Sequence, residues 1–376
     1  MKWRLLIVAC GIGAIVVAGA LLTFRLGRPA ALRPHPGDPP PEISPAEIPA
    51  AALTPARIPH GSETDAVFPD GSGDWAVIDS DGGRVVRTGP GGEVRWATPL
   101  AGHVGGVRWP HVVADTDRAY VRNARGVTVL DARTGKVAWR SPGPEDRLLL
   151  SGDLLLAADC CCWDDVERTG RWLVAWRATT GEEAFRVALP VKDFDPLPIK
   201  ENAGLFLVQD NDSPGGRGAA LLIDRAGRVF HRFDRQVVAV AACGDDRVVV
   251  TSRDVVRLGA DGRVLWTTPF PTRCWIAGGG LVLLPAGDMV AYLYGRISDG
   301  GVQVMRLDLA SGQKVWEVWC LGLGVGHSKY HQDALAALDG RKLVVTSRGS
   351  SGIFVEALDV ETGKSLGRWV SRGIKD

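Results

Sequence analysis

The sequence lacks the features that mark many enzymes and most nucleic-acid-binding proteins. Its 44 basic and 43 acidic side chains leave a formal net charge of only +1. No basic stripe with interleaved aromatic residues occurs, so the usual electrostatic footprint of nucleic-acid binding is missing. No Gly-x-Ser-x-Gly nucleophile elbow or comparable catalytic motif is found. These absences argue against a nucleic-acid partner and give no support to a specific reaction.

The composition favours a turn-rich fold with a packed core. Apolar residues make up 45% of the chain and charged residues 23%, proportions typical of globular proteins. There are 47 glycines and 13 tryptophans. Glycine at this frequency favours many tight turns over long helices.

The N-terminal segment, residues 1–28, reads as a transmembrane signal anchor. Lys2 and Arg4 precede an uncharged run from Leu5 to Phe24, and about twenty residues of helix span the roughly 30 Å of a bilayer core. Two alternatives stay open: cleavage after the small residues 18–20, and lipidation at Cys10, which would leave a very short apolar stretch before it. We therefore predict a membrane tether through residues 5–24.

Residues 29–61 are predicted to form a disordered, proline-rich stalk. Ten prolines lie between Pro29 and Pro59. Such a segment supports neither helix nor sheet and favours extended polyproline II. The stalk would hold the body of the protein, residues 62–376, away from the membrane.

That body consists of a recurring phrase. Residues 129–139 read Val-Leu-Asp-Ala-Arg-Thr-Gly-Lys-Val-Ala-Trp, and related phrases occur at 307–316 and 358–363. Looser copies complete a series of seven turn glycines that lie 35 to 51 residues apart: Gly92, Gly135, Gly181, Gly227, Gly262, Gly312 and Gly363. This spacing is typical of one four-stranded propeller blade per repeat.

The chemistry of the phrase predicts a hairpin. The Asp carboxylate can accept hydrogen bonds from the following backbone amides, and the Gly supplies the positive φ that closes the turn. An aromatic residue follows about four positions later, as in Trp96, Trp139, Trp266 and Trp316. We expect these rings to pack on a neighbouring sheet, where each contributes about 2–3 kcal/mol by burial.

The phrase Asp-x-x-Thr/Ser-Gly-x-x-x-Trp resembles the repeat of the pyrroloquinoline-quinone (PQQ)-like propeller family. The resemblance covers residue 62 to the C-terminus. It implies an all-β fold, a single propeller of about seven four-stranded blades, with eight left open. The family includes quinoprotein dehydrogenases, a propeller lipoprotein of outer-membrane assembly, and anchored proteins without a cofactor, so fold is implied more firmly than function.

The repeat also predicts which rim of the propeller binds. The short Asp-x-x-Thr-Gly turns share one rim, while the B–C and D–A connections, which vary in length, share the other. Taking Leu281–Leu284 as the second strand of blade six places insertions in blades three and six. We further expect the chain start near Val67 to pair with the last strand near Trp369 and so close the ring.

A run of three cysteines is the most unusual feature of the variable rim. Cys160, Cys161 and Cys162 could form a disulfide with Cys274 or Cys320. Six cysteines outside the membrane segment suit an oxidising compartment and favour a propeller outside the cytoplasm. A thiolate metal site lacks the usual spaced pairs. Stacking of these cysteines over a quinone, as the family resemblance implies for dehydrogenases, would require PQQ as the cofactor and a bound calcium ion.

Other polar and aromatic residues on the predicted connections complete a candidate binding face. They are Trp163, Asp164, Asp210, Asp212, Trp275, His327 and His331. The two histidines lack the intervening Glu of a metalloprotease, and the aspartates lack the spacing of a calcium loop. The sequence therefore predicts a non-catalytic scaffold that binds a protein or peptide without a cofactor. A PQQ-dependent dehydrogenase and an envelope sensor for a sugar or wall fragment are the alternatives.

Overall fold

The computed structural model describes most of the region after residue 64. The described residues are 65–79, 83–100, 112–123, 126–142, 148–158, 172–189, 199–210, 219–270, 276–285, 287–295, 302–320, 333–349 and 352–372. The predicted membrane anchor and stalk lie outside them. Within the described ranges, no helix has the length and apolar character needed to cross a membrane.

The described residues form 28 strands in seven four-stranded antiparallel sheets. Sheet 1 holds β1 (Asp65–Val67), β2 (Trp75–Asp79), β3 (Arg84–Thr88) and β4 (Val94–Pro99); sheet 2 holds β5 (Val112–Ala114), β6 (Arg118–Asn123), β7 (Gly126–Asp131) and β8 (Val137–Ser141); sheet 3 holds β9 (Leu148–Ser151), β10 (Leu154–Ala158), β11 (Trp172–Arg177) and β12 (Glu183–Ala188); sheet 4 holds β13 (Lys200–Asn202), β14 (Leu205–Gln209), β15 (Ala220–Asp224) and β16 (Val229–Phe233). Sheet 5 holds β17 (Val237–Cys243), β18 (Asp246–Thr251), β19 (Asp254–Leu258) and β20 (Val264–Pro269); sheet 6 holds β21 (Ile276–Leu283), β22 (Asp288–Gly295), β23 (Val302–Asp308) and β24 (Lys314–Cys320); sheet 7 holds β25 (Asp333–Asp339), β26 (Lys342–Gly349), β27 (Gly352–Asp359) and β28 (Ser365–Arg372).

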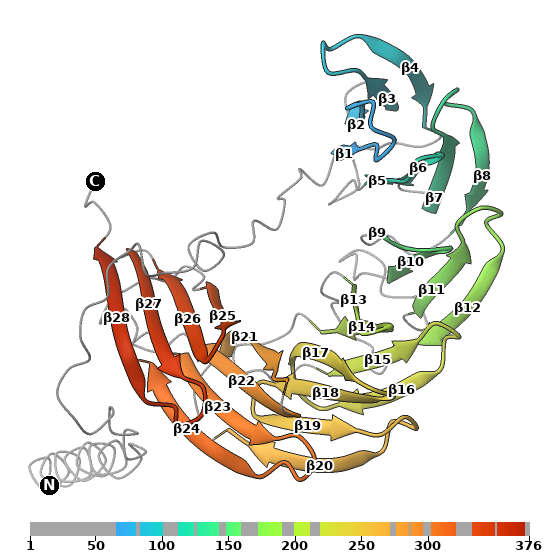
Figure 1. Ribbon diagram of the computed structural model, residues 1–376. Helices are drawn as coiled ribbons and strands as arrows, with labels where there is room; N and C mark the ends of the chain where they lie inside the picture. The colour runs from blue at the N-terminus through green and yellow to red at the C-terminus, as the bar shows by residue number, and fades with distance from the viewer. Residues whose placement is uncertain are drawn as a thin grey trace, which may run out of the picture.

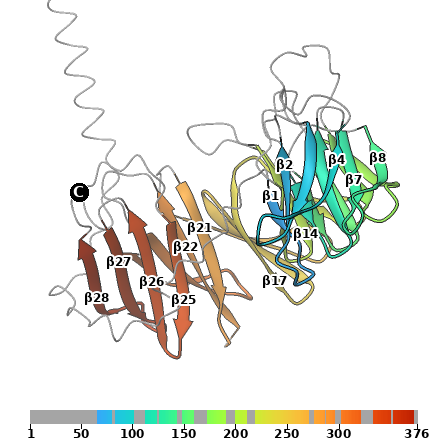
Figure 2. The same ribbon diagram turned by 90° about the horizontal axis from the view of Figure 1, so that it is seen from above.

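The sheets follow one another around a common centre as the blades of a propeller (Figure 1). The first strand of each sheet is innermost, and β1 contacts β5, β5 contacts β9, β17 contacts β21, and β21 contacts β25. The all-β architecture with seven four-stranded blades is thus confirmed. Both ribbon views show an arc whose ends, sheets 1 and 7, stand apart (Figures 1 and 2).

The hydrophobic core lies between the sheets. Each of the six junctions between consecutive sheets contains its own buried apolar cluster. Between sheets 1 and 2, for example, Ile78 and Trp96 pack with Val121 and Leu130. A seventh cluster, centred on Val344 and Val355, belongs to sheet 7 alone. The blades therefore stabilise one another as neighbours rather than through one central core.

The repeated phrase forms the hairpin between the third and fourth strands. In sheet 2 the carboxylate of Asp131 accepts hydrogen bonds from the backbone N–H of Thr134 (2.7 Å) and from its hydroxyl (2.6 Å). The N–H of Gly135 donates to the carbonyl of Asp131 (2.9 Å), and Gly135 has a φ of +69°. All seven turn glycines have positive φ, which confirms the predicted turn chemistry.

The predicted pairing of the chain start with the last strand is wrong. Val67 of β1 pairs with Trp75 of β2, and Trp369 of β28 pairs with Val355 of β27. Each blade consists of four consecutive strands, so the first strand is already used as the innermost strand of sheet 1. Hydrogen bonding between β1 and β28 therefore does not close the ring.

The predicted second strand of blade six is also wrong. Leu281–Leu283 belongs to β21, the innermost strand, and the second strand is β22 (Asp288–Gly295). Both segments are apolar runs, so the sequence pattern did not distinguish them. The connection from β22 to β23 spans only residues 296–301, and the long insertion expected in blade six disappears.

Candidate functional site at the junction of sheets 1 and 2

Most of the predicted binding-face residues lie outside the described residues. These are Cys160, Cys161, Cys162, Trp163, Asp164, Asp212, Cys274, Trp275, His327 and His331. Asp210 is described and directly follows β14, where its N–H donates to the carbonyl of Ala219 (3.0 Å). Asp210 thus lies at the start of the connection between β14 and β15, on the predicted variable rim.

Cys320 is described, at the end of β24. Its free thiol is buried, with a relative exposure of 1%. Burial raises the pKa of this thiol well above its usual value, and the neighbouring Glu356 adds to the shift. A buried, protonated thiol is a poor nucleophile. The disulfide between the cysteine run and Cys274 or Cys320 stays a prediction.

The opposite rim, which carries the short turns, is described except for residue 286 and contains a repeated connection between blades. Each tryptophan that follows a turn glycine donates its indole N–H to a backbone carbonyl in the next turn along the chain. The pairs are Trp96 to Ala132 (2.6 Å), Trp139 to Ala178 (3.0 Å), Trp266 to Leu309 (3.1 Å) and Trp316 to Val360 (2.9 Å). The expected packing of these rings on the neighbouring sheet is confirmed.

The turn glycines have a second role that the sequence did not reveal. The Trp139 ring lies directly against Gly181 of the next blade, where an added Cβ would come within 2.6 Å of a ring carbon. Trp96 contacts Gly135 in the same way, and Trp316 contacts Gly363. Glycine at these positions therefore provides both the positive φ and the space for a neighbouring ring.

An arginine strengthens three of these junctions. In sheet 1, the guanidinium of Arg87 donates to the carbonyl of Ala132 (2.9 Å), which Trp96 also contacts, and to Oδ2 of Asp74 (2.7 Å). The other Asp74 oxygen, Oδ1, is buried and accepts no hydrogen bond from the described residues. We call this set of an arginine, a tryptophan and a shared carbonyl the Arg–Trp latch.

The latch recurs between sheets 5 and 6 and between sheets 6 and 7. Arg257 donates to Leu309 (2.7 Å), and Arg306 donates to Val360 (2.8 Å). The sequence did not reveal the role of these arginines because their acceptors are backbone carbonyls in another repeat. A signal was nevertheless present: each arginine precedes a turn glycine by five or six residues.

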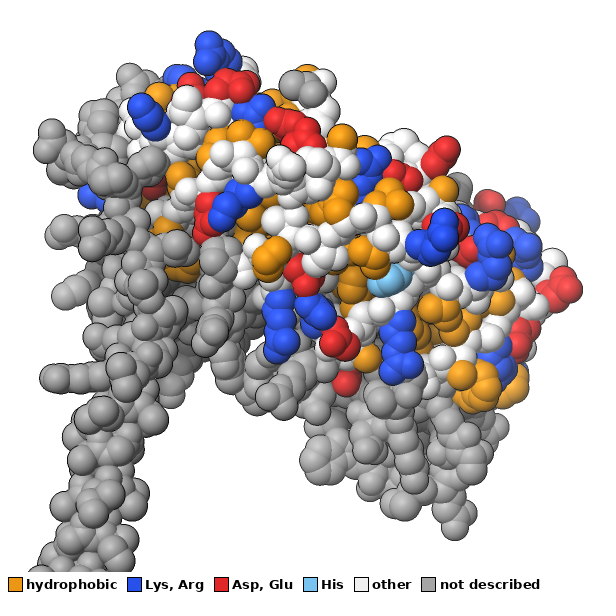
Figure 3. Space-filling model, turned by 90° about the horizontal axis from the view of Figure 1, so that it is seen from below, with side chains coloured by type: hydrophobic (Ala, Val, Ile, Leu, Met, Phe, Trp, Pro, Cys, Tyr) orange, Lys and Arg blue, Asp and Glu red, His pale blue; other side chains and the backbone are white. Residues whose placement is uncertain are grey.

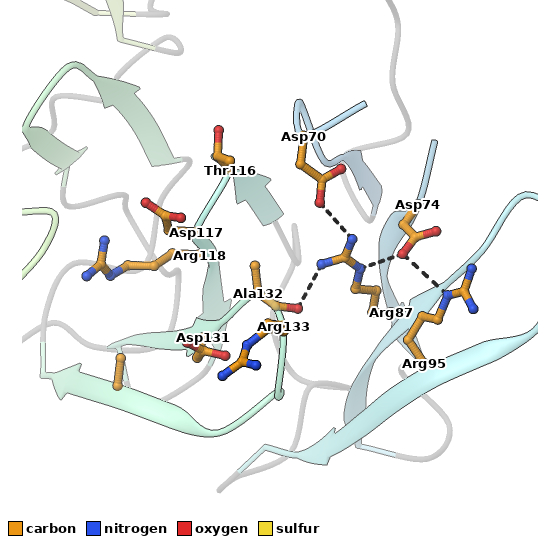
Figure 4. Close-up of a pocket in the computed structure, with 11 residues that line it drawn as sticks. Asp70, Asp74, Arg87, Arg95, Thr116, Asp117, Arg118, Asp131, Ala132 and Arg133 are labelled. Atoms are coloured by element: carbon orange, nitrogen blue, oxygen red, sulfur yellow. Dashed lines mark hydrogen bonds and ion pairs between the residues drawn. The ribbon is translucent and has the colours of Figure 1, made fainter. Parts of the chain in front are cut away.

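Beside the first latch, sheets 1 and 2 enclose a pocket of about 740 Å³ (Figure 4). It is lined by the first turn of sheet 1, by both turns of sheet 2 and by the strands next to them. The lining residues are Asp70, Asp74, Arg87, Arg95, Thr116, Asp117, Arg118, Asp131, Ala132, Arg133 and Ala138. This is the candidate site among the described residues.

Two kinds of charged side chain line the pocket: some form ion pairs with each other, and others are accessible to a ligand. Arg87 forms ion pairs with Asp70 (2.8 Å) and Asp74 (2.7 Å). Burial alone would lower the pKa of Arg87, but these two carboxylates raise it. Arg118 is half-buried and Arg133 is exposed, so their guanidinium groups can pair with carboxylates of a bound molecule. Asp117 and Asp131 line the same pocket, so its charges are mixed and do not select a ligand of one sign.

Asp70 makes the stability of this junction sensitive to acid. Hydrogen bonds from the hydroxyl and the N–H of Ser72, followed by Arg87, lower the pKa of Asp70 to about 2 from 3.8. A lowered folded-state pKa stabilises the fold at neutral pH, and this contribution disappears as the pH falls from about 4 to about 2. We expect Asp70→Asn to cost more stability at pH 7 than at pH 2.5. Denaturant unfolding at both values measures the two costs; equal costs would contradict the assignment.

The residues over which a quinone would stack, Cys160, Cys161 and Cys162, lie outside the described residues. Among the described residues, no group of three or more His, Cys, Asp or Glu residues is placed to hold a metal ion. The lining of the candidate pocket pairs carboxylates with guanidinium groups instead. No step of quinone chemistry is therefore assigned to these residues.

Comparison with known proteins agrees with the fold. The family profile described as outer membrane protein assembly factor BamB matches residues 51–165 and 216–370. These two segments make up more than half of the sequence. The chain belongs to this family. No curated protein matches the sequence.

Solved structures similar to this member of the BamB family share little sequence identity with it. BamB from Moraxella catarrhalis is 16% identical, with 82% of this chain and 88% of that chain covered and a TM-score of 0.40. The Dos1 propeller is 15% identical, with 80% and 81% covered and a TM-score of 0.44. Quinohemoprotein alcohol dehydrogenase from Comamonas testosteroni is 11% identical, with 80% and 66% covered and a TM-score of 0.39.

Proposed function

We propose that this chain is a membrane-tethered scaffold that binds a protein or peptide outside the cytoplasm. The observation that carries the proposal is membership of a family described as an outer membrane protein assembly factor. An assembly factor works by holding other proteins. The scaffold would act without catalysis and without a cofactor.

The two rims of the propeller support a division of roles. On the turn rim, the hairpins between the third and fourth strands are four or five residues long in every sheet. On the other rim, the connections between the second and third strands range from 124–125 in sheet 2 to 159–171 in sheet 3. Variable connections on a rigid frame are the usual place for binding, so we assign partner binding to this variable rim.

The face of the molecule seen in Figure 3 does not suggest a charged polymer as the partner. Figure 3 shows Lys and Arg side chains interspersed with Asp and Glu, with apolar side chains between them. A surface of mixed sign lacks the long-range field that attracts nucleic acid. A protein or peptide partner fits this surface better.

A photo-crosslinking experiment in the native membrane tests the binding rim. A benzophenone amino acid is placed at Asp210, on the variable rim, and as a matched control at Arg263, whose side chain is 85% exposed on the turn rim. We expect covalent adducts with another protein from position 210 and none from position 263. The reverse pattern would move the binding surface to the turn rim, and no adduct from either position would contradict a protein-binding role.

The tether is tested separately. Residues 5–24 should keep the full chain in the membrane during alkaline extraction, whereas a chain that begins at residue 62 should be released. External protease should digest the propeller of the full chain if it lies outside the cytoplasm. Retention of both chains in the membrane would contradict the tether through residues 5–24. Protection of the propeller from protease would contradict the orientation outside the cytoplasm.

The alternative reading as a PQQ-dependent dehydrogenase has its own measurement. Purified protein is incubated with PQQ and Ca²⁺, passed through a desalting column, and examined by absorbance and native mass spectrometry. If the chain is a scaffold without a cofactor, we expect the protein to retain no quinone after the column. A stoichiometric quinone complex would replace it by the dehydrogenase reading.

A further inference from the structure

The pocket between sheets 1 and 2 presents equal numbers of positive and negative side chains. Its lining contains four arginines and four aspartates, together with one threonine and two alanines. An arginine guanidinium has only hydrogen-bond donors, and an ionised carboxylate has only acceptors. A ligand that uses the whole lining must therefore both donate and accept hydrogen bonds.

On the side of sheet 1, the charged groups neutralise one another. Arg87 forms ion pairs with Asp70 (2.8 Å) and Asp74 (2.7 Å). Its guanidinium also donates to the carbonyl of Ala132 on sheet 2 (2.9 Å), so this wall is fixed to the second turn of sheet 2 (Figure 4). A wall that is already neutral needs no counter-ion from a ligand, and a fixed wall reduces the entropy lost on binding.

On the side of sheet 2, three exposed side chains remain open to a ligand. Thr116 and Asp117 belong to the turn between β5 and β6, and Arg133 belongs to the turn between β7 and β8. The Asp117 carboxylate and the Arg133 guanidinium form no hydrogen bond with another described residue. This side of the pocket therefore offers a free acceptor, a free donor, and a hydroxyl that can act as either.

We propose that this pocket binds a neutral polyhydroxy compound, such as a short saccharide. Hydroxyl groups of such a ligand donate hydrogen bonds to Asp117 and accept them from Arg133, so one kind of functional group satisfies both kinds of charge. The pocket volume of about 740 Å³ lies within the roughly 300–1,000 Å³ that is usual for small-ligand sites. The site lies on the turn rim, so a bound saccharide leaves the variable rim free for a protein or peptide partner.

Ionic ligands fit the same lining less well. An anion that pairs with Arg133 shares the pocket with the carboxylates of Asp117 and Asp131, and a cation that pairs with Asp117 shares it with Arg118 and Arg133. Like charges in one site oppose binding. A formal charge also loses more hydration on entering the pocket than a neutral hydroxyl does. A zwitterion, such as a dipeptide, is the ionic alternative that matches both signs, and it serves as the competing probe.

A ligand-observed NMR titration of the purified full-length protein, in a detergent without a sugar headgroup, tests the ligand class. The probes are three neutral trisaccharides, namely maltotriose, cellotriose and triacetylchitotriose, and the zwitterion alanyl-alanine. We expect at least one trisaccharide to bind, with a dissociation constant that changes by less than about twofold between about 0.05 M and about 0.5 M NaCl, because salt screens charge pairs. Binding of the dipeptide alone, affinity that falls steeply with salt, or no binding of any trisaccharide would overturn the proposal.

Two substitutions locate the bound saccharide. Asp117→Ala and Arg133→Ala should each weaken trisaccharide binding by about tenfold or more, as expected when a hydrogen bond to a charged group is lost. The control is Arg263→Ala in the turn between β19 and β20, where the side chain is 85% exposed, and it should leave binding unchanged. Circular dichroism establishes that all three variants remain folded. Unchanged binding in both pocket variants, or an equal loss in Arg263→Ala, would overturn the assignment of the site.

Discussion

Gly181→Ala should destabilise the protein by about 3 kcal/mol, well beyond the cost of a left-handed alanine. Its φ of +76° costs a residue with a Cβ about 1 kcal/mol. The new Cβ would also lie 2.6 Å from the Trp139 ring, and forcing extra volume into a packed site typically costs a further 1–3 kcal/mol. Chemical denaturation monitored by tryptophan fluorescence gives the free energy of unfolding.

The matched control is Gly204→Ala. Gly204 has the same φ of +76°, and an added Cβ there would meet nothing within 4 Å. We expect this variant to lose only about 1 kcal/mol. The difference between the two variants isolates the ring contact from the backbone strain. Equal losses would mean that the Trp139 ring does not need the space at Gly181.

Arg306→Ala should lower the free energy of unfolding by about 3 kcal/mol or more, because it removes one partner of a largely buried ion pair. The side chain of Arg306 is only 8% exposed, and it pairs with Asp288 and Glu361, both at 2.6 Å. It also donates to the carbonyl of Val360, across the junction of sheets 6 and 7. Its removal leaves the carboxylate of Asp288, which is 16% exposed, without its ion-pair partner.

Arg263→Ala is the control for Arg306→Ala. Arg263 pairs with Asp261 at 2.6 Å, but the two side chains are 85% and 55% exposed. Exposed ion pairs typically contribute about 0–1 kcal/mol, so this variant should be close to the wild-type protein in urea unfolding. A loss as large as that of Arg306→Ala would show that burial is not what makes the latch strong.

The repeat predicted the fold because its signals are local. The hairpin of sheet 2 forms through hydrogen bonds among Asp131, Thr134 and Gly135 within one turn. Such a turn can be recognised from a single stretch of sequence. The packing role of Trp139 could be predicted from its distance in sequence to the turn glycine alone. The apolar run Leu281–Leu283 was assigned to the wrong strand because innermost strands and second strands can both be apolar, and composition does not separate them.

The candidate site was less predictable because its contacts cross between repeats. Arg87 binds the carbonyl of Ala132, 45 positions further along the chain, and a carbonyl acceptor leaves no mark on the sequence. The pocket forms from turns of sheets 1 and 2 that look like ordinary repeat turns when read one at a time. Of the residues predicted for the binding face, Asp210 is described, and its place after β14 permits a direct test of the variable rim.

The four consecutive strands of every blade have a consequence for synthesis. Each sheet pairs only strands that are neighbours in the sequence, so a blade can fold as soon as its own segment has emerged. Each new blade then finds the apolar face of its predecessor already formed. A chain that leaves the ribosome or a translocation channel N-terminus first can therefore assemble blade by blade, without waiting for its last residues to complete the first sheet.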